Sequence, residues 1–196
     1  MNTTNTPMNR PNVSFAPGPL ILGAMILAAA LTRVMPHPWN FSPVEAIALF
    51  GGAYFASRSL AIVVPLVAMF ASDLALSGIH GGTYATYFGS MSFWLVYACI
   101  ALSSVLGFGL RGKVNGVRVL GYSLMGSVLF FLVTNFAAWI GSSMYPQNAA
   151  GLLAAYIAGV PFFQGTLLGT LFFSALLFGG FSLLRHRMPV LRAQTV

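Results

Sequence analysis

Residues 59–76 read SLAIVVPLVAMFASDLAL, an apolar run that contains one acidic residue, Asp73. A helix needs about 20 predominantly apolar residues to cross the hydrocarbon core of a bilayer. Further apolar segments flank this run, at 18–34, 43–56, 84–109, 118–144 and 162–184. The sequence therefore predicts an all-α integral membrane protein, a bundle of six transmembrane helices. Because segment 43–56 is short for a span, five spans is the alternative.

The composition supports a membrane protein. Hydrophobic residues make up 58% of the 196 residues and charged residues 6%, and the mean hydropathy is +0.84. No soluble domain fits between the apolar segments. We therefore divide the chain into a disordered cytoplasmic tail at 1–17, a transmembrane bundle at 18–185 and a basic cytoplasmic tail at 186–196. The net charge is +7, but the cations are dispersed between spans, so we expect the lipid bilayer and no nucleic acid as a partner.

The basic residues predict the orientation of the bundle, because cytoplasmic connections of membrane proteins are enriched in Lys and Arg. With the N-terminus inside, the predicted outer connections hold only Arg33, and the other eight cations are cytoplasmic: Arg10, Arg58, Arg111, Lys113, Arg118, Arg185, Arg187 and Arg192. Both termini are then cytoplasmic, which favours an even number of spans. The predicted location is the bacterial inner membrane.

The unusual polar side chains gather at the outer ends of the predicted spans. A carboxylate at the centre of a bilayer costs roughly 2.5 to 3.5 kcal/mol on insertion scales, so such a group tends to face a cavity or a partner. We predict an outward-open pocket with a proline-stiffened wall or lid, residues 35–45, that contains His37 and Glu45. The other predicted binding residues are Asp73, His80, Tyr84, Asn135, Trp139 and Phe162.

Each carboxylate has a structural alternative. Glu45 follows Ser42 and Pro43, a pattern typical of a helix N-terminus, so capping or pairing with Arg33 competes with ligand binding. Asp73 comes late in its helix, where the dipole disfavours a negative charge. It is predicted to bind the solute or organise the pocket, to pair with Arg33 or a loop donor, or simply to be exposed.

The remaining candidates also have two interpretations. His80 precedes two glycines and is either an exposed loop residue or a contact for a solute or metal. Asn135 and Trp139 lie four residues apart and share a helix face. They are expected to line the pocket, or else to join helices and anchor the membrane interface.

No catalytic motif accompanies these residues. The sequence has no HExxH zinc motif, no cysteine cluster and no phosphate-cradling glycine loop with its lysine. A serine hydrolase would need a nucleophile beside a base and an orienting acid, and no nucleophile motif is present. We therefore assign no catalytic residue. Any active transport is expected to draw its energy from another protein.

Four segments carry a family resemblance: LTRVMPHPWNFSPVEAIALFGGAYF, VPLVAMFASDLALSGIH, FFLVTNFAAWIGSSMYP and PFFQGTLLGTLFF. They resemble a family of small bacterial membrane proteins of unassigned function, with the shared motifs RxxPHPxNFxPVxAxALFGGAYF, SDL and FFxxTNFxxW, over about residues 31–175. That family resembles the substrate-binding S components of energy-coupling factor (ECF) vitamin transporters. These are six-helix proteins that hold a vitamin near the outer face and normally pair with an ATPase module. The nearest functional relatives are the BtuM-type cobalamin S components.

The resemblance implies a transport protein that captures a vitamin-class solute, first of all cobalamin, with an ECF ATPase module as a candidate partner and no required cofactor. BtuM-type proteins ligate cobalt through a loop cysteine. This chain has His80 in the corresponding connection, so His80 is the candidate cobalt ligand and thiolate-dependent decyanation is not expected. Ala24 and Ala28 resemble the alanine motif that docks S components on their module. The alternatives are a membrane enzyme or cofactor-modifying protein using the same cavity, and a structural subunit without a small ligand.

Overall fold

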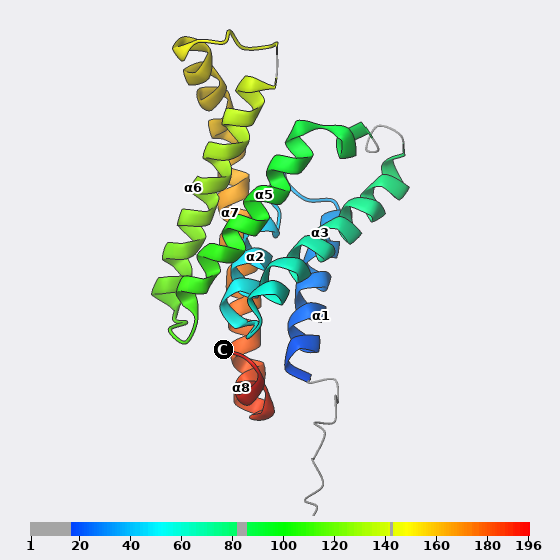
Figure 1. Ribbon diagram of the computed structural model, residues 1–196, viewed down its shortest axis with the longest axis vertical. Helices are drawn as coiled ribbons and strands as arrows, with labels where there is room; N and C mark the ends of the chain where they lie inside the picture. The colour runs from blue at the N-terminus through cyan, green and yellow to red at the C-terminus, as the bar shows by residue number, and fades with distance from the viewer. Residues whose placement is uncertain (1–16, 82–85, 142) are drawn as a thin grey trace, which may run out of the picture.

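The computed structural model describes residues 17–81, 86–141 and 143–196, and all regular secondary structure in these residues is helical. Figure 1 shows the helices packed as one bundle. In chain order they are α1 (Pro17–Leu31), η1 (Thr32–Val34), α2 (Val44–Tyr54), α3 (Arg58–His80), η2 (Thr86–Gly89), α5 (Met91–Gly107), η3 (Phe108–Leu110), α6 (Gly116–Ile140), α7 (Ala149–Arg187) and α8 (Val190–Gln194).

Within the described residues, five helical segments are long and apolar enough to cross a membrane, which confirms the prediction of an all-α, multi-pass membrane protein. The sixth apolar segment forms α2, which has only 11 residues. At 1.5 Å per residue α2 is about 16 Å long, roughly half the thickness of the hydrocarbon core. The sixth predicted span is therefore a half-length helix.

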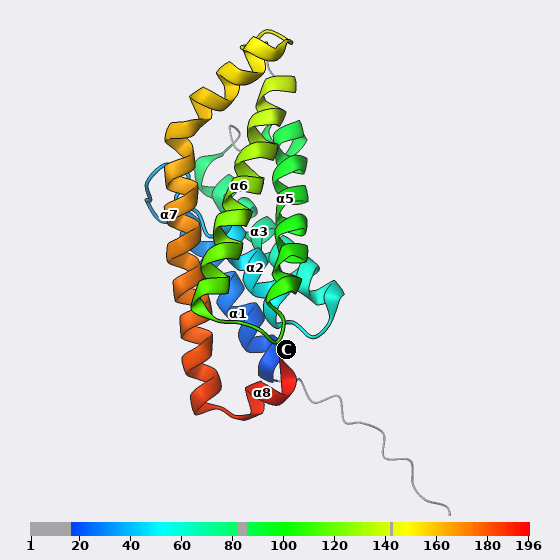
Figure 2. The ribbon, with the colours of Figure 1, turned by 90° about the vertical axis from the view of Figure 1, so that its left-hand side faces the viewer.

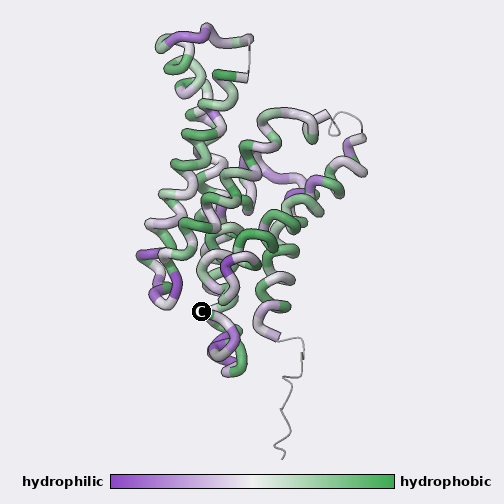
Figure 3. Tube along the Cα trace, viewed as in Figure 1, coloured by the Kyte–Doolittle hydropathy of each residue, from purple (hydrophilic) through white to green (hydrophobic). Residues whose placement is uncertain are grey.

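The chain reverses direction between successive helices, so α2, α5 and α7 run opposite to α1, α3 and α6 (Figure 1). The start of α1 and the end of the chain consequently meet, and the backbone N–H of Gly18 donates a hydrogen bond to Oε1 of Gln194 at 2.8 Å. We call this the basic end, because it also carries Arg58, Arg118 and Arg185. The polar connections at both ends stand out against the apolar helices (Figure 3).

Helix α2 is the centre of the bundle. Every one of its residues is buried, and it contacts all five long helices. A helix that is apolar on all sides is stable only when it is enclosed. The enclosure is tight on the α5 side, where a Cβ atom added to Gly107 would lie 2.5 Å from the carbonyl oxygen of Leu49, so this approach requires glycine.

The buried end of α2 has an internal partner for its free carbonyl groups. The Arg111 side chain donates from Nε to the carbonyl of Gly52 and from a terminal nitrogen to the carbonyl of Phe55, each at 2.9 Å. Burial lowers the pKa of Arg111, and the nearby Arg58 lowers it further. Because the last carbonyl groups of a helix have no partner within it, this guanidinium allows α2 to end at Tyr54.

Helix α7 is the longest element, with 39 residues, and it continues through Pro161. Proline removes one backbone hydrogen bond and bends a helix, and Figure 2 shows α7 bent in its first half. The first turns of α7 and the last turns of α6 extend beyond the other helices (Figures 1 and 2).

The segment 186–196, predicted as a basic tail, folds back onto the bundle. Leu191 in α8 is fully buried, and the N–H of Val196 donates to the carbonyl oxygen of Tyr54. The predicted tail at 1–17 lies outside the described residues except for Pro17, which begins α1.

Candidate functional site

A connecting segment, residues 35–43, crosses the bundle between η1 and α2. Its backbone rests directly on α7, where a Cβ atom added to Gly169 would lie 2.6 Å from the backbone nitrogen of Ser42. Asn40 adopts a φ of 57°, a left-handed conformation that asparagine tolerates better than most residues. The glycine and the asparagine together let this proline-containing segment turn and lie flat against the helix.

Beneath this segment lies a cavity of about 650 Å³, which we call the acidic cavity because both acidic side chains of the protein line it. The structure brings four of the predicted binding residues to its wall: His37, Glu45, Asp73 and His80. They come from the 35–43 segment, α2 and α3. The first turn of α2 reaches the same wall, so the half-length helix begins at the cavity.

Asp73 is held by two neighbouring side chains. Its Oδ1 atom lies 2.7 Å from a guanidinium nitrogen of Arg33, and its Oδ2 atom accepts a hydrogen bond from the Tyr97 hydroxyl at 2.8 Å. The same nitrogen of Arg33 lies 3.1 Å from Oγ of Ser72. The carboxylate side chain is only 2% exposed. The predicted pairing with Arg33 is therefore confirmed, and Asp73 fixes Arg33 at the cavity wall.

Glu45 is buried, and its Oε2 atom accepts a hydrogen bond from the Thr170 hydroxyl of α7 at 3.3 Å. The predicted cap by Ser42 is wrong, because α2 begins at Val44, its N-cap residue is Pro43, and the cap makes no side-chain hydrogen bond. The Ser42 hydroxyl is instead buried at the cavity and has no hydrogen-bond partner. The Glu45 carboxylate at the start of α2 and the unsatisfied Ser42 hydroxyl just before it thus lie at the same cavity.

Two histidines line the acidic cavity, His37 from the 35–43 segment and His80 from α3. His80 is the last residue of α3 rather than a loop residue, and its Nδ1 atom lies 3.1 Å from the carbonyl oxygen of Leu76. Nδ1 of His80 thus faces the preceding turn of α3. Nδ1 of His37 is 2.9 Å from the carbonyl oxygen of Pro38.

A metal site built by the protein alone is not found among the described residues, which contain no group of three or more His, Cys, Asp or Glu side chains able to hold an ion. Of the residue types that commonly bind metals, His37, Glu45, Asp73 and His80 line the acidic cavity.

Three predicted binding residues lie away from the acidic cavity, in the long α6–α7 pair. Asn135 donates to the carbonyl of Phe131 one turn earlier, and Trp139 donates from Nε1 to the carbonyl of Pro146. Phe162 is 46% exposed and lies beside Trp39, with ring centroids 6.4 Å apart. The Asn135 hydrogen bond stays within α6 and the Trp139 hydrogen bond reaches the connection to α7, so neither bond shows the predicted role in joining helices. Tyr84 lies outside the described residues.

Sequence reasoning missed three residues at this site: Thr166, which lines the cavity, and Tyr97 and Thr170, which contact its two carboxylates. Tyr97 lies in the middle of α5, where a tyrosine in an apolar run resembles many residues that face lipid. Thr166 and Thr170 lie one turn apart on α7, and their spacing was the available signal that one face of this helix carries hydroxyls. Recognising which hydroxyl meets Glu45 required knowing how α7 packs on α2.

Comparison with known proteins identifies the family. The chain belongs to a family of unknown function, DUF6580, whose model matches residues 13–191. No curated protein and no solved structure matches it. The prediction that the chain is a member of a family without an assigned function is confirmed.

Proposed function

We propose that this protein is a membrane transport protein that captures a vitamin-class solute in the acidic cavity, with cobalamin as the first candidate. The observation that carries the proposal is the half-length helix α2, which begins at a cavity inside the bundle. In many transporters, interrupted helices begin at the binding site, where their free N–H groups and dipole act on the solute.

The size and lining of the cavity support a small-molecule site. Its volume of about 650 Å³ falls within the range of roughly 300 to 1,000 Å³ that is typical of ligand pockets. Its polar groups are few: Arg33, Asn40, Ser42, Glu45, Asp73, Thr166 and the two histidines. Cobalamin is larger than the ligands such a pocket usually encloses, so its capture would require the 35–43 segment to move aside.

The distribution of charge supports an orientation with the acidic cavity open to the outside of the bacterial inner membrane. Arg111, Lys113 and Arg118 join α5 to α6, and Arg185 and Arg187 end α7, all at the basic end. Cytoplasmic connections are enriched in such cations. Both described ends of the chain would then be cytoplasmic.

An ECF ATPase module remains the proposed source of energy. Ala24 and Ala28 lie one turn apart on α1, and both are exposed on the outside of the bundle. A face of small residues permits close approach of a second helix. This face is the proposed docking surface for the module.

A membrane enzyme or cofactor-modifying protein is the second candidate. It is favoured by the presence of two histidines and two carboxylates on one cavity wall, which are common groups in proton transfer. Mass spectrometry of the recovered solute separates the two functions, since a transport protein returns the solute unchanged and an enzyme returns a modified one.

The direct test is a titration of the purified full-length protein with aquocobalamin, followed by visible absorbance. Capture predicts saturable binding and a band shift when an imidazole replaces the axial water. His80→Ala should abolish the shift, whereas the matched control His186→Ala, at the basic end, should retain it. Absence of saturable binding would contradict cobalamin, and an unchanged shift in His80→Ala would remove His80 as the cobalt ligand.

Transport requires a separate assay. A strain dependent on external cobalamin should grow at limiting vitamin when it expresses this protein, and a deletion of residues 35–43 should abolish that growth. Normal growth with the deletion variant would show that the segment does not shape the site.

A further inference from the structure

A second cavity, of about 890 Å³, lies at the basic end between α6 and α7. We call it the basic cavity. Its wall on α7 extends from Leu171 to Arg185, about 21 Å along the helix axis. It therefore reaches from the basic end well into the membrane-spanning part of the bundle.

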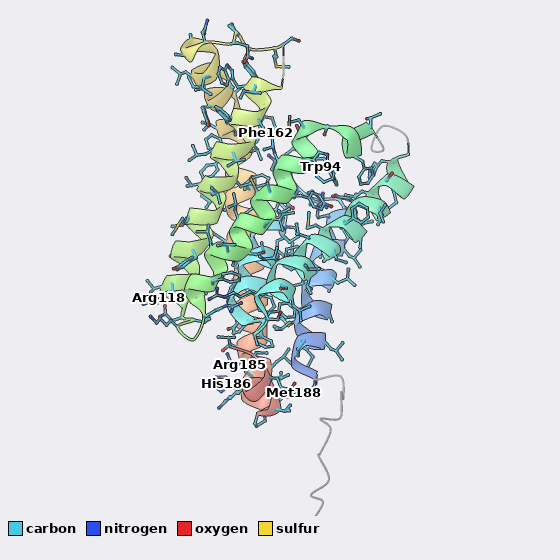
Figure 4. The ribbon with its side chains drawn as sticks, in the orientation of Figure 1. Trp94, Arg118, Phe162, Arg185, His186 and Met188 are labelled. Carbon is cyan, nitrogen blue, oxygen red and sulfur yellow. The ribbon has the colours of Figure 1, made fainter. Side chains whose placement is uncertain are left out.

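The lining changes from apolar to cationic along this length. Inside, the wall is formed by Val119 and Leu120 of α6 and by Leu171, Ala175 and Phe178 of α7. At the basic end it is formed by Arg185, His186 and Arg192. Figure 4 shows Arg185 and His186 together at the end of α7. This is the pattern of a site for a ligand with an anionic head and an apolar body.

The cations are gathered by the fold of the chain end. Because α8 turns back, Nε of Arg192 donates to the carbonyl oxygen of Arg185 at 3.0 Å, and a terminal nitrogen of Arg192 lies 3.3 Å from Nδ1 of His186. Both acidic side chains of the protein, Glu45 and Asp73, line the other cavity. The positive charge at the basic cavity is thus not balanced by an acidic side chain on its wall.

We propose that the basic cavity binds an anionic phospholipid, with the headgroup phosphate at Arg185, His186 and Arg192 and an acyl chain along the apolar wall between α6 and α7. A soluble phosphate would satisfy the cations but leave the apolar length of the cavity empty. A zwitterionic lipid would fill that length but bring no net negative charge. Basic pockets between membrane helices favour anionic headgroups for these reasons. The site is independent of the solute proposed for the acidic cavity.

The test is native mass spectrometry of the full-length protein in detergent, with phosphatidylglycerol and phosphatidylcholine of identical acyl chains supplied in equal amounts. The protein should retain phosphatidylglycerol preferentially. In the double variant Arg185→Gln, Arg192→Gln, the ratio of retained phosphatidylglycerol to phosphatidylcholine should fall about fivefold for each arginine removed. The matched double variant Arg118→Gln, Arg187→Gln removes the same charge at the same end from side chains outside the cavity lining, and it should keep the preference.

A second pair of variants tests the apolar wall without changing any charge. Gly179 lines the cavity, and a Cβ atom added there would meet nothing within 4 Å, so Gly179→Leu fills the cavity. Gly121 also has open space around it but is outside the lining, so Gly121→Leu is the control. Only Gly179→Leu should reduce the retained phosphatidylglycerol.

Three results would overturn the proposal. Equal retention of the two lipids by the unaltered protein would show that charge does not select the ligand. An equal loss of retained phosphatidylglycerol in the cavity variants and in their controls would show that the lipid is attracted to the basic end in general and not to the cavity. Displacement of phosphatidylglycerol by inorganic phosphate alone would identify the ligand as a soluble anion.

Discussion

The acidic and basic cavities use charge in opposite ways. In the acidic cavity the Arg33 guanidinium and the Asp73 carboxylate pair at 2.7 Å, and the Tyr97 hydroxyl donates to the same carboxylate. In the basic cavity the arginines contact carbonyl groups, a histidine and an aromatic ring, with Arg185 5.5 Å from the ring centroid of Tyr54. The charges of Arg33 and Asp73 are therefore compensated by each other, whereas neither acidic side chain of the protein pairs with Arg185 or Arg192.

The largest effect is expected from breaking the compensated pair. Asp73→Ala leaves the Arg33 side chain, only 15% exposed, without its carboxylate. Removing one partner of a buried ion pair costs about 3 kcal/mol, and we expect this loss in the free energy of unfolding measured by SDS titration. The double variant Arg33→Met, Asp73→Ala should regain much of the loss.

The matched variant at the basic cavity is Arg185→Gln, measured in the same SDS titration. Because Arg185 has no carboxylate partner there, the change should alter the free energy of unfolding by less than about 0.5 kcal/mol. A loss comparable to that of Asp73→Ala would show that the basic cavity also depends on its charges for stability.

A smaller difference in the free energy of unfolding is expected between substitutions at two helical glycines, one in α2 and one at the basic cavity. Gly52→Ala should destabilise the protein by about 2 kcal/mol, because the new methyl group would collide with the carbonyl oxygen of Ser104 and the Cα atom of Gly107. Gly179→Ala should be neutral or slightly stabilising, since its methyl group meets nothing within 4 Å. Comparing the two in the same SDS titration tests whether α2 is the rigid centre of the bundle; similar values would contradict it.

The smallest expected effect concerns the cover of the acidic cavity. Asn40 has a φ of 57°, so Asn40→Val should cost about 1 kcal/mol of backbone strain, whereas Asn40→Gly should be tolerated. The cost should appear as faster proteolysis within the 35–43 segment. Equal cleavage of both variants would show that this conformation is not required.

Several features could be predicted from the sequence alone. The apolar segments predicted the helices because each run is long enough to require burial or lipid on all sides. The short segment 43–56 also indicated that α2 differs from the other helices. The pairing of Asp73 with Arg33 was one of the predicted alternatives, because a charge in an apolar helix tends to find a partner.

The members of each cavity were decided by tertiary structure. Asn135, Trp139 and Phe162 have the residue types of a binding site, but the packing of α6 and α7 leaves them out of the lining of the acidic cavity. Tyr97 joins Asp73 only because α5 packs against α3 at that height. Composition and periodicity determined which segments enter the membrane. Helix length, glycine contacts and the docking of α8 decided which side chains meet within the bundle. Contacts between segments that are distant in the sequence arise from packing, so a local sequence pattern does not predict them.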